Sequence, residues 1–304
     1  MELLLILGSI PSLLGVGYVA HAHGLLTPRR RDRLNAVAYY VALPALLFTS
    51  TAGRAFSDIV SADLVIGVVI VMTVMVGIAW FLHREYRDPR VRSVGTIQSY
   101  HTNFGYLGVP LVALIFGEVA TGRAALILGI GALIQISATI TILSTLNGAG
   151  SIRADLRRIL FNPIMLSLFA GLGASAFGIP LHAGTVTVLG VAGDFALPIA
   201  LLCAGASLTI QPSAIDYRLT GGVLSLKIVV MPLIAFGTFL WLGADTETVR
   251  AAVLMFAMPT AVSTYVFSSE LGGDPELASM NVFTTTVVST VTLFGVAQLL
   301  FLLT

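Results

Sequence analysis

The sequence has few charged residues for its length. Only 10% of its 304 residues are Asp, Glu, Lys or Arg, whereas 57% are hydrophobic and the mean hydropathy is +0.96. A soluble domain carries about 25% charged residues, so this chain cannot cover a water-facing surface. Its net charge of +1 is too small for a nucleic-acid-binding surface. We therefore predict an all-α polytopic membrane protein that is surrounded by a lipid bilayer and has no nucleic-acid partner.

The sequence also has a single cysteine, Cys203, in the apolar run LLCAG. One cysteine cannot form a disulfide within the chain, and no Cys/His spacing typical of zinc sites is present. Ser-His-Asp spacings, glycine-rich phosphate loops and metal-ligand clusters are lacking too. We therefore expect no enzyme activity, no metal site and no cofactor, and we interpret Cys203 as a buried helix residue.

Long hydrophobic runs, in contrast, follow one another along the whole chain. One membrane span needs roughly 20 apolar residues, and the runs predict ten transmembrane helices. The predicted spans cover residues 2–20, 34–52, 62–82, 94–117, 123–146, 162–179, 187–209, 220–242, 248–271 and 277–303. The first run resembles a signal peptide but has no basic residues before it, since Glu2 is the only early charge. We interpret it as a retained first span.

Arginine is distributed unequally between the predicted loops. The loops after spans 1, 3, 5 and 7 hold 12 arginines, whereas the loops on the opposite side hold three, Arg54, Arg123 and Arg250. Basic loops stay in the cytoplasm. We therefore predict a multi-pass protein of the cell membrane with an even number of spans and both termini outside.

Three prolines of the first half recur in the second half in the same order, at offsets of 149 to 154 residues. The pairs are Pro11 and Pro163, Pro44 and Pro198, and Pro110 and Pro259. The chain therefore divides into two five-helix halves, residues 1–146 and 162–304, joined by a cytoplasmic linker at 147–161. An odd number of spans reverses the second half across the membrane. The result is the 5+5 inverted-topology repeat of many secondary transporters.

The stretch HTNFGYLGVP (101–110) lies in the middle of span 4, and Pro259 lies in the middle of span 9. Proline breaks a helix, and a break inside a membrane is tolerated only where protein or water satisfies the backbone. Two broken helices that cross would direct partially positive N-termini at one point, which suits a carboxylate. The candidate substrate-binding residues there are Asn103, Gly105, Gly108, Pro110, Pro259, Ser263 and Thr264. The alternative, that both prolines are simple kinks, is disfavoured by their matched positions.

Other polar residues inside the spans are candidates for ion or proton coupling, because ionisable groups are costly in a membrane. Asp194 binds a proton or cation, pairs with Lys227, or is hydrated near the outer interface. Lys227 snorkels toward the cytoplasmic interface, forms an internal pair, or contacts an anionic substrate. Gln98 and His101 shape an ion path or tie the freed backbone together. Gln135 in span 5, a further candidate for substrate binding, faces either the crossover or a neighbouring helix.

Two motifs resemble a known family. NFGYLGVPLVALIFGE resembles the fourth span of bacterial members of the auxin efflux carrier family, and MPTAVSTYVFSSELGGDPELASMNVFTTTVVS resembles its ninth and tenth spans. The resemblance covers nearly the whole chain. It implies secondary transport of organic anions, namely auxin in plants and dicarboxylates such as malonate or malate in bacterial relatives. It also implies a fold similar to that of bile-acid sodium symporters.

In that fold, spans 1, 2, 6 and 7 form a scaffold, and spans 3–5 and 8–10 form a transport domain that holds both crossovers. By motif position, the candidate residues of spans 4 and 9 carry over as the two crossovers. Sodium-coupled relatives have an acidic residue in the ninth-span crossover, whereas MPTAVST has none and Glu270 comes later. This difference argues against a sodium site like theirs, and the coupling ion, Na⁺ or H⁺, stays open. A second copy of the chain is a candidate partner by family analogy alone.

The sequence therefore predicts a secondary active transporter that binds a small carboxylate where spans 4 and 9 cross and works by alternating access. One alternative is a cation/proton antiporter of related fold. An antiporter needs a titratable carboxylate at the crossover, and the nearest candidate is Asp194. The other alternative is a membrane receptor without turnover, although a receptor has no evident need for two matched breaks.

Overall fold

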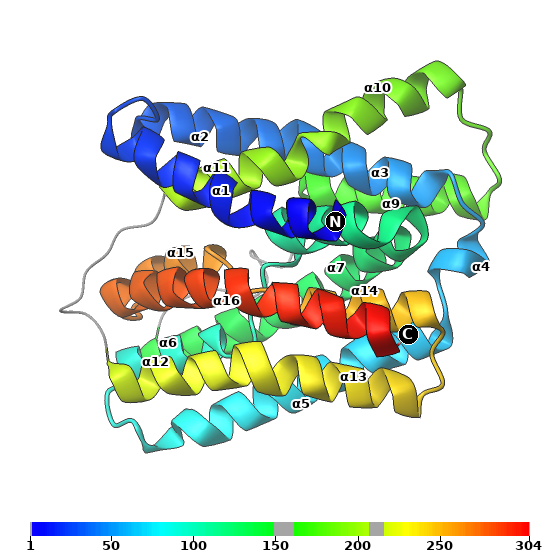
Figure 1. Ribbon diagram of the computed structural model, residues 1–304. Helices are drawn as coiled ribbons and strands as arrows, with labels where there is room; N and C mark the ends of the chain where they lie inside the picture. The colour runs from blue at the N-terminus through cyan, green and yellow to red at the C-terminus, as the bar shows by residue number, and fades with distance from the viewer. Residues whose placement is uncertain (1, 149–160, 207–215, 304) are drawn as a thin grey trace. The chain divides into compact units, whose positions relative to one another are not determined.

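The computed structural model describes residues 2–148, 161–206 and 216–303, with side chains from residue 12 onward. The described residues form helices and turns, and the one β-bridge among them is isolated (Figure 1). The predicted helical fold class is thus confirmed. Most of the predicted linker at 147–161 lies outside the described residues.

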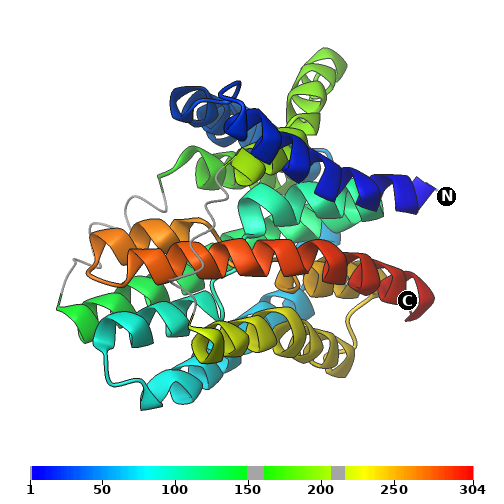
Figure 2. The same ribbon diagram turned by 60° about the vertical axis from the view of Figure 1, so that its left-hand side comes forward.

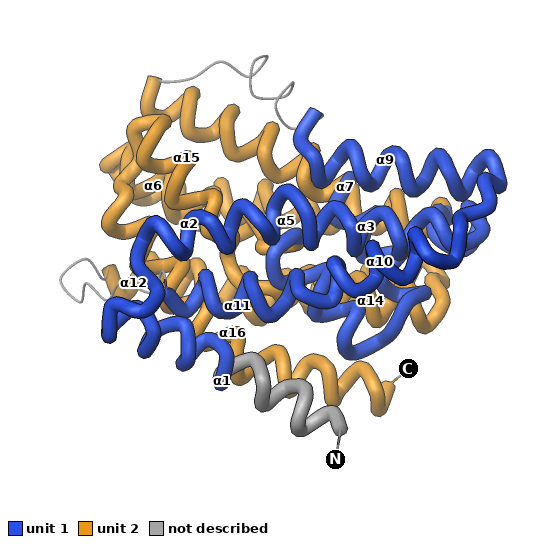
Figure 3. Tube along the Cα trace, turned by 90° about the horizontal axis from the view of Figure 1, so that it is seen from above, with its two compact units in different colours: residues 1–61, 105–129, 160–208 blue, residues 62–104, 130–159, 209–304 orange. Residues whose placement is uncertain are grey.

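The chain divides into two compact units, coloured separately in Figure 3. Unit 1 comprises residues 1–61, 105–129 and 160–208, and unit 2 comprises residues 62–104, 130–159 and 209–304. Each unit is therefore built from three separate stretches of the chain. The division into scaffold and transport domain stays a prediction.

Unit 1 is a group of helices held together by close backbone contacts. Its elements are α1 (Glu2–Ala22), α2 (Pro28–Val37), the π-helical turn η1 (Ala38–Ala42), α3 (Leu43–Ala52), α4 (Phe56–Ile59), α9 (Pro163–Ala176), α10 (Ala183–Asp194) and α11 (Ala196–Ala206). Helix α1 packs along α11, and α3 packs against α9 and α10 (Figure 1). A Cβ atom on Gly17 would clash with the carbonyl oxygen of Leu202, and one on Gly205 would clash with that of Leu14. Glycine at both places lets the two helices approach this closely.

Unit 2 contains the remaining helices. Its elements are α5 (Ala62–Leu82), the 3₁₀ turn η2 (His83–Glu85), α6 (Pro89–Gln98), α12 (Tyr217–Leu224), the π-helical turn η5 (Ser225–Val230), α13 (Met231–Trp241), α14 (Thr246–Phe256), α15 (Ser263–Glu270) and α16 (Pro275–Leu303). Helix α13 packs against α5 and α14, while α6 packs against α5, α15 and α16. Helices α15 and α16 lie side by side (Figures 1 and 2).

Helix α7 (Val109–Asn147) is shared by the units and is not one straight helix. The π-helical turn η3 (Phe104–Gly108) precedes it, and Gly117 interrupts it with φ 76° and ψ −164°. Glycine adopts this conformation without the steric cost of a Cβ atom. Gly117 therefore forms the corner between predicted spans 4 and 5.

Each of the three π-helical turns among the described residues comes directly before a helix whose second residue is proline. These prolines are Pro44, Pro110 and Pro232. Proline has no N–H for the carbonyl four residues earlier, and its ring crowds that carbonyl. The turn widens instead, so that the N–H of Met231 bonds to the carbonyl of Leu226, five residues earlier. At Pro44, Pro110 and Pro232 the helix is thus widened into a π turn before the proline.

Six helical segments among the described residues are long and apolar enough to cross a membrane, so the chain is a multi-pass membrane protein. They are Pro28–Ala52, Phe56–Glu85, Phe104–Asn147, Ala183–Ala206, Tyr217–Trp241 and Pro275–Leu303. Shorter apolar helices at Ser12–Ala22 and Pro163–Ala176 coincide with predicted spans 1 and 6. Predicted spans 4 and 9 are each interrupted, and their pieces α6, α14 and α15 are short. The count of ten spans and the inverted repeat stay predictions.

Predicted span 7 corresponds to the candidate span Ala183–Ala206, and its helix is interrupted at Phe195. Helix α10 ends at Asp194 and α11 begins at Ala196. Pro198 is the third residue of α11 and cannot donate to the carbonyl of Asp194, so the helical hydrogen bonding is interrupted between the two helices.

Candidate functional site

Two interrupted helices of unit 2 are joined through their backbones. Helix α6 ends at Gln98, α14 ends at Phe256, and the chain between each of them and the next helical turn is not helical. We call these two segments, residues 99–103 and 257–262, the crossover. Thr102 and Thr260 form an antiparallel β-bridge within it. The crossover therefore brings together residues that lie far apart in the sequence.

Two backbone hydrogen bonds form this bridge. The N–H of Asn103 donates to the carbonyl of Pro259 at 3.0 Å, and the N–H of Ala261 donates to the carbonyl of His101 at 3.0 Å. In a membrane, backbone groups released by a break need such partners. Each break in unit 2 therefore supplies the hydrogen bonds that the other break has lost.

The structure places the first break earlier than Pro110. The helix is interrupted at 99–103, whereas Gly105 and Gly108 lie in η3, and Pro110 is the second residue of α7. An N–H in the first turn of a helix has no partner within the helix, so proline is well tolerated there. Pro110 thus starts the second half of span 4, and the chain opens at the polar residues before it. Pro259 lies within the second break, as predicted.

Gln135 of α7 clamps the crossover from one side. Its side-chain oxygen accepts the N–H of Thr102 at 2.9 Å, and its side-chain nitrogen donates to the carbonyl of Thr102 at 3.2 Å. Both atoms are buried. Of the two predicted alternatives, Gln135 therefore faces the crossover, where its amide satisfies one residue's backbone completely.

A buried amide network lies on another side of the crossover. Gln98 donates to Thr264 Oγ1 at 3.0 Å and to a backbone carbonyl of α16, and its oxygen accepts from the Asn281 amide at 2.8 Å. Asn281 in turn accepts from Thr220 Oγ1 at 2.7 Å. The hydroxyl of Thr260 donates to the carbonyl of Gln98 at 2.8 Å. Gln98 and Thr264 thus have internal partners that link α6, α12, α15 and α16 to the crossover.

Asn281 and Thr220 were not among the residues predicted from the sequence. Asn281 is fully buried in α16, and its sequence signal is an amide within the apolar stretch MNVF. Its partner Gln98 precedes it by 183 residues. The network depends on this long-range contact, which no local pattern indicates.

His101 is buried in the crossover and contacts two hydroxyl groups. Its Nδ1 lies 2.8 Å from Thr139 Oγ1, and its Nε2 lies 3.4 Å from Ser263 Oγ. The Tyr100 hydroxyl also contacts Thr139 Oγ1, at 3.0 Å. The imidazole therefore connects the crossover to α7 and to the first residue of α15.

Lys227 of η5 reaches the crossover from within unit 2. Its side chain is fully buried, and its Nζ donates to Thr102 Oγ1 at 2.7 Å and to the carbonyl of Phe256 at 3.2 Å. Met231 Sδ is a third acceptor at 3.0 Å. These contacts contradict the alternative in which Lys227 snorkels toward an interface, because its ammonium points to the crossover.

Asn103 differs from its polar neighbours in the crossover. Its backbone N–H is bonded to Pro259, but its side-chain amide makes no hydrogen bond with any residue that the structure describes. Asn103 keeps 8% of its surface exposed. Ser263, the first residue of α15, is exposed as well. Asn103 in the crossover, and Ser263 just after it, therefore have hydrogen-bonding capacity still available to a ligand, although Ser263 also contacts His101.

The remaining predicted coupling residue, Asp194, lies in unit 1 at the end of α10 and is exposed. Within the described ranges, no group of three or more His, Cys, Asp or Glu side chains could hold a metal ion. The buried polar groups of the crossover are thus amides, hydroxyls, one imidazole and one ammonium.

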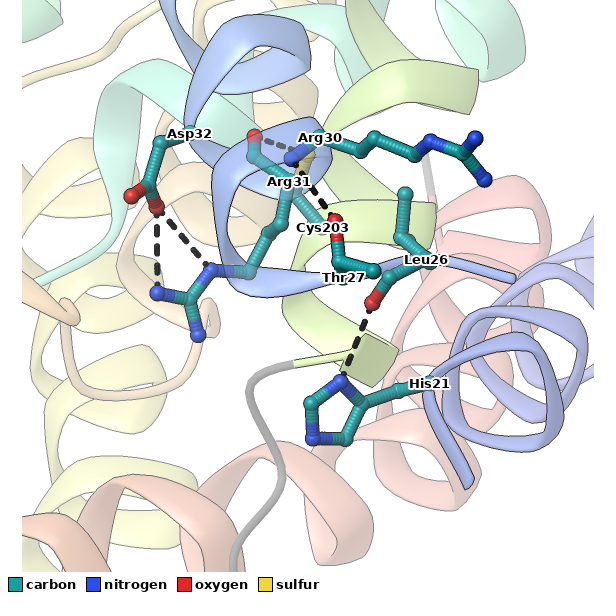
Figure 4. A network of polar contacts seen from close by, with 7 residues as sticks. All are labelled: His21, Leu26, Thr27, Arg30, Arg31, Asp32 and Cys203. Atoms are coloured by element: carbon teal, nitrogen blue, oxygen red, sulfur yellow. Dashed lines mark hydrogen bonds and ion pairs between the residues drawn. The ribbon is translucent and has the colours of Figure 1, made fainter. Parts of the chain in front are cut away.

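A second polar cluster, in unit 1, surrounds the start of α2 (Figure 4). Thr27 caps α2 by accepting the N–H of Arg30 at 3.4 Å, and Arg31 forms an ion pair with Asp32 at 3.1 Å. Cys203 is buried, as predicted, and its Sγ lies 3.7 Å from the carbonyl oxygen of Arg31. These contacts start α2 and fix it against α11.

Comparison with known proteins shows that the chain is similar to membrane transporters. Residues 9–296 match the profile of a family described as membrane transport protein. The chain is 30% identical over 293 residues to an "Uncharacterized transporter" of Methanothermobacter thermautotrophicus, with 94% of each chain covered. It is 27% identical over 297 residues to a "Putative malonate transporter" of Rhizobium meliloti, with 91% of each chain covered.

Proposed function

We propose that this chain, which belongs to the auxin efflux carrier family of membrane transport proteins, carries a small organic anion by secondary active transport. The family confirms the resemblance predicted from the two motifs. It also makes the chain a transporter and not an enzyme. The anion, the binding site and the mechanism are our proposal.

The observation that carries the proposal is the crossover with its unpartnered amide. Two backbone hydrogen bonds join the breaks, Gln135 binds the backbone of Thr102, and most polar side chains around them have internal partners. The amide of Asn103 has none among the described residues. Its atoms are not among the fully buried polar atoms without a partner, and the residue keeps 8% of its surface exposed, so the amide is accessible to a ligand that hydrogen-bonds to it. Asn103 is therefore our first candidate for substrate contact, followed by Ser263.

A carboxylate suits this site on electrostatic grounds. The ammonium of Lys227 lies at the crossover, and α15 begins at Ser263 with the partially positive end of a helix. The name of the Rhizobium meliloti relative points to malonate, which carries two carboxylates. We propose a small mono- or dicarboxylate as the substrate class and malonate as the first compound to test.

The finer architecture belongs to the same proposal. Ten spans, an inverted repeat and a scaffold with a transport domain would let the crossover open alternately to the two sides of the membrane. The location in the cell membrane with both termini outside follows from the arginine distribution. No carboxylate among the described residues hydrogen-bonds within the crossover, so no observation favours the cation/proton antiporter.

The test is uptake of labelled malonate and related carboxylates into liposomes that contain the purified protein. Replacing Asn103 by alanine should lower the apparent affinity about tenfold, because a hydrogen bond to a charged ligand is worth about 1.5–3 kcal/mol. Its thermal unfolding should stay unchanged, since the amide has no internal partner to lose. Asn35→Ala, at an exposed position of α2, is the matched control.

Normal uptake by well-folded Asn103→Ala would remove Asn103 from the site. If the wild-type protein moves no carboxylate under any ion gradient, the proposed function is wrong, and the receptor alternative takes its place. Proton movement that depends on Asp194, without anion flux, would instead indicate the antiporter.

A further inference from the structure

Lys227 is the only lysine in the chain, because the other 15 of the 16 basic Lys and Arg residues are arginines. It is also fully buried. It lies in the π turn η5, which Pro232 follows closely. Single π turns inside helices are frequent at functional sites, and ionisable groups inside a membrane are functional hypotheses by default. The burial of the sole lysine of this chain therefore indicates a functional role.

The three partners of the Lys227 nitrogen are all acceptors. The Phe256 carbonyl and the Met231 sulfur can only accept a hydrogen bond. The Thr102 hydroxyl donates to the carbonyl of Tyr100 at 3.0 Å, so it accepts from Lys227. Three acceptors match the three donors of an ammonium, whereas a neutral amine has only two. The geometry therefore fits the charged form of Lys227.

No carboxylate of the described residues lies within ion-pair distance of Lys227. Its partners are a carbonyl, a hydroxyl and a thioether, and the ion pairs among the described residues of unit 2 involve Arg218 and Arg250 instead. The crossover thus holds one positive charge that neighbouring side chains do not neutralise. A buried charge without a counter-charge is expensive, and an anion bound nearby would lower that cost.

The acceptors around the Lys227 nitrogen are of the kind that bind cations at broken helices. Phe256 is the last residue of α14, and its carbonyl belongs to the partially negative end of that helix. In transporters with broken helices, such C-terminal ends and unwound carbonyls coordinate the coupling ion. Here the ammonium already donates to the carbonyl of Phe256 and to a hydroxyl of the unwound segment at 99–103.

We propose that the ammonium of Lys227 is a built-in cation, which fills the place of a coupling sodium ion at the crossover and supplies the counter-charge for the transported carboxylate. The second part of this inference rests on the proposed function. Its consequence is that anion binding and uptake need no Na⁺. An arginine in this place would keep the charge but bring a larger, planar donor group.

The first experiment tests the cation site without any substrate. Thermal unfolding of the purified protein is measured in sodium chloride and in choline chloride, and the wild type should unfold at the same temperature in both. Lys227→Ala leaves the acceptors without a cation, so it should unfold at a lower temperature. Methylammonium should restore part of the loss, whereas methanol, which is similar in size but neutral, should not.

Val229→Ala is the matched control, because Val229 lies in the same π turn and is exposed. The proposal is overturned if Na⁺ specifically stabilises the wild type, or if Lys227→Ala responds to methylammonium no more than Val229→Ala does. If Lys227→Ala fails to fold, the unfolding temperatures of the wild type in sodium chloride and in choline chloride still test the proposal.

The second experiment uses malonate uptake into liposomes. The wild type should take up malonate equally well with Na⁺ or choline on both sides. Lys227→Met, which keeps an unbranched side chain one atom shorter but not the charge, should weaken the apparent affinity about tenfold or more, and Lys227→Arg should weaken it less. A sodium requirement of the wild type, or unchanged affinity in Lys227→Met, would contradict the proposal. If no carboxylate is transported at all, the proposed function fails, while the unfolding experiment still judges the cation site.

Discussion

Gln135 shows how much a single side chain contributes to the crossover. Thr102 has an extended backbone whose N–H and carbonyl both point to the Gln135 amide. The amide therefore acts on Thr102 as the edge of a neighbouring strand would. The Thr102 hydroxyl meanwhile accepts the hydrogen bond from Lys227. One residue of the unwound segment is thus fixed by partners from two other helical elements.

Replacing Gln135 by leucine should destabilise the protein, because the N–H of Thr102 would stay buried without a partner, while its carbonyl would keep only the N–H of Phe104. A buried N–H without a partner costs about 1–3 kcal/mol. We expect a clearly lower unfolding temperature together with reduced malonate uptake. Gln298→Leu, at a partly exposed position of α16, is the control and should change neither. Equal unfolding temperatures of the two variants would show that the clamp contributes nothing to stability.

At the scale of the element, the π turns determine which way the side chains before each proline point. Inserting one residue into a helical turn rotates everything beyond it by about 100°. In η5 this rotation decides the direction of Lys227, because the turn widens where Pro232 lacks its N–H. The proline of α13 is therefore part of the arrangement of the crossover, although its own side chain donates nothing to it.

Pro232→Ala should restore an N–H to the carbonyl of Ile228 and allow η5 to close into a regular α-helix. The unfolding temperature should stay the same or rise, whereas uptake should fall at least about tenfold as Lys227 leaves Thr102 and Phe256. Pro275→Ala at the first position of α16, where proline removes no helical hydrogen bond, should leave uptake unchanged. Full activity of Pro232→Ala would show that the π turn does not position Lys227.

The elements could be predicted from the sequence where the signal is local. Hydrophobic runs located the helices, and the matched prolines indicated that spans 4 and 9 are interrupted. The first break overlaps the start of the predicted stretch 101–110, and its exact place could not be predicted, because it lies where 99–103 pairs with 257–262 and not at Pro110. The link between Gln98 and Asn281 was missed for the same reason, since it depends on residues that only the fold brings together.

At the scale of the whole molecule, orientation depends on the arginine-rich loops, and it can be tested with cysteine labelling. Cys203 is buried and the only cysteine, so Cys203→Ser gives a background without thiols. A cysteine at the exposed position of Arg87 should be protected from a membrane-impermeant maleimide in intact cells, and one at the exposed Thr246 should react. Permeabilised cells, in which both should react, are the control. The reverse pattern in intact cells would place the termini inside.

The two backbone segments that pair in the crossover are synthesised at different times. The N–H of Asn103 bonds to the carbonyl of Pro259, which follows it by 156 residues in the sequence. At roughly 5–20 residues per second, the ribosome needs on the order of 10–30 s to deliver this partner. During that interval the segment 99–103 is already synthesised, whereas its hydrogen-bonding partner, the segment 257–262, is not. The segment must therefore stay hydrated, or be covered by another protein, until the second half of the chain has been synthesised. We expect that nascent chains truncated before residue 259 are removed fastest by quality-control proteases.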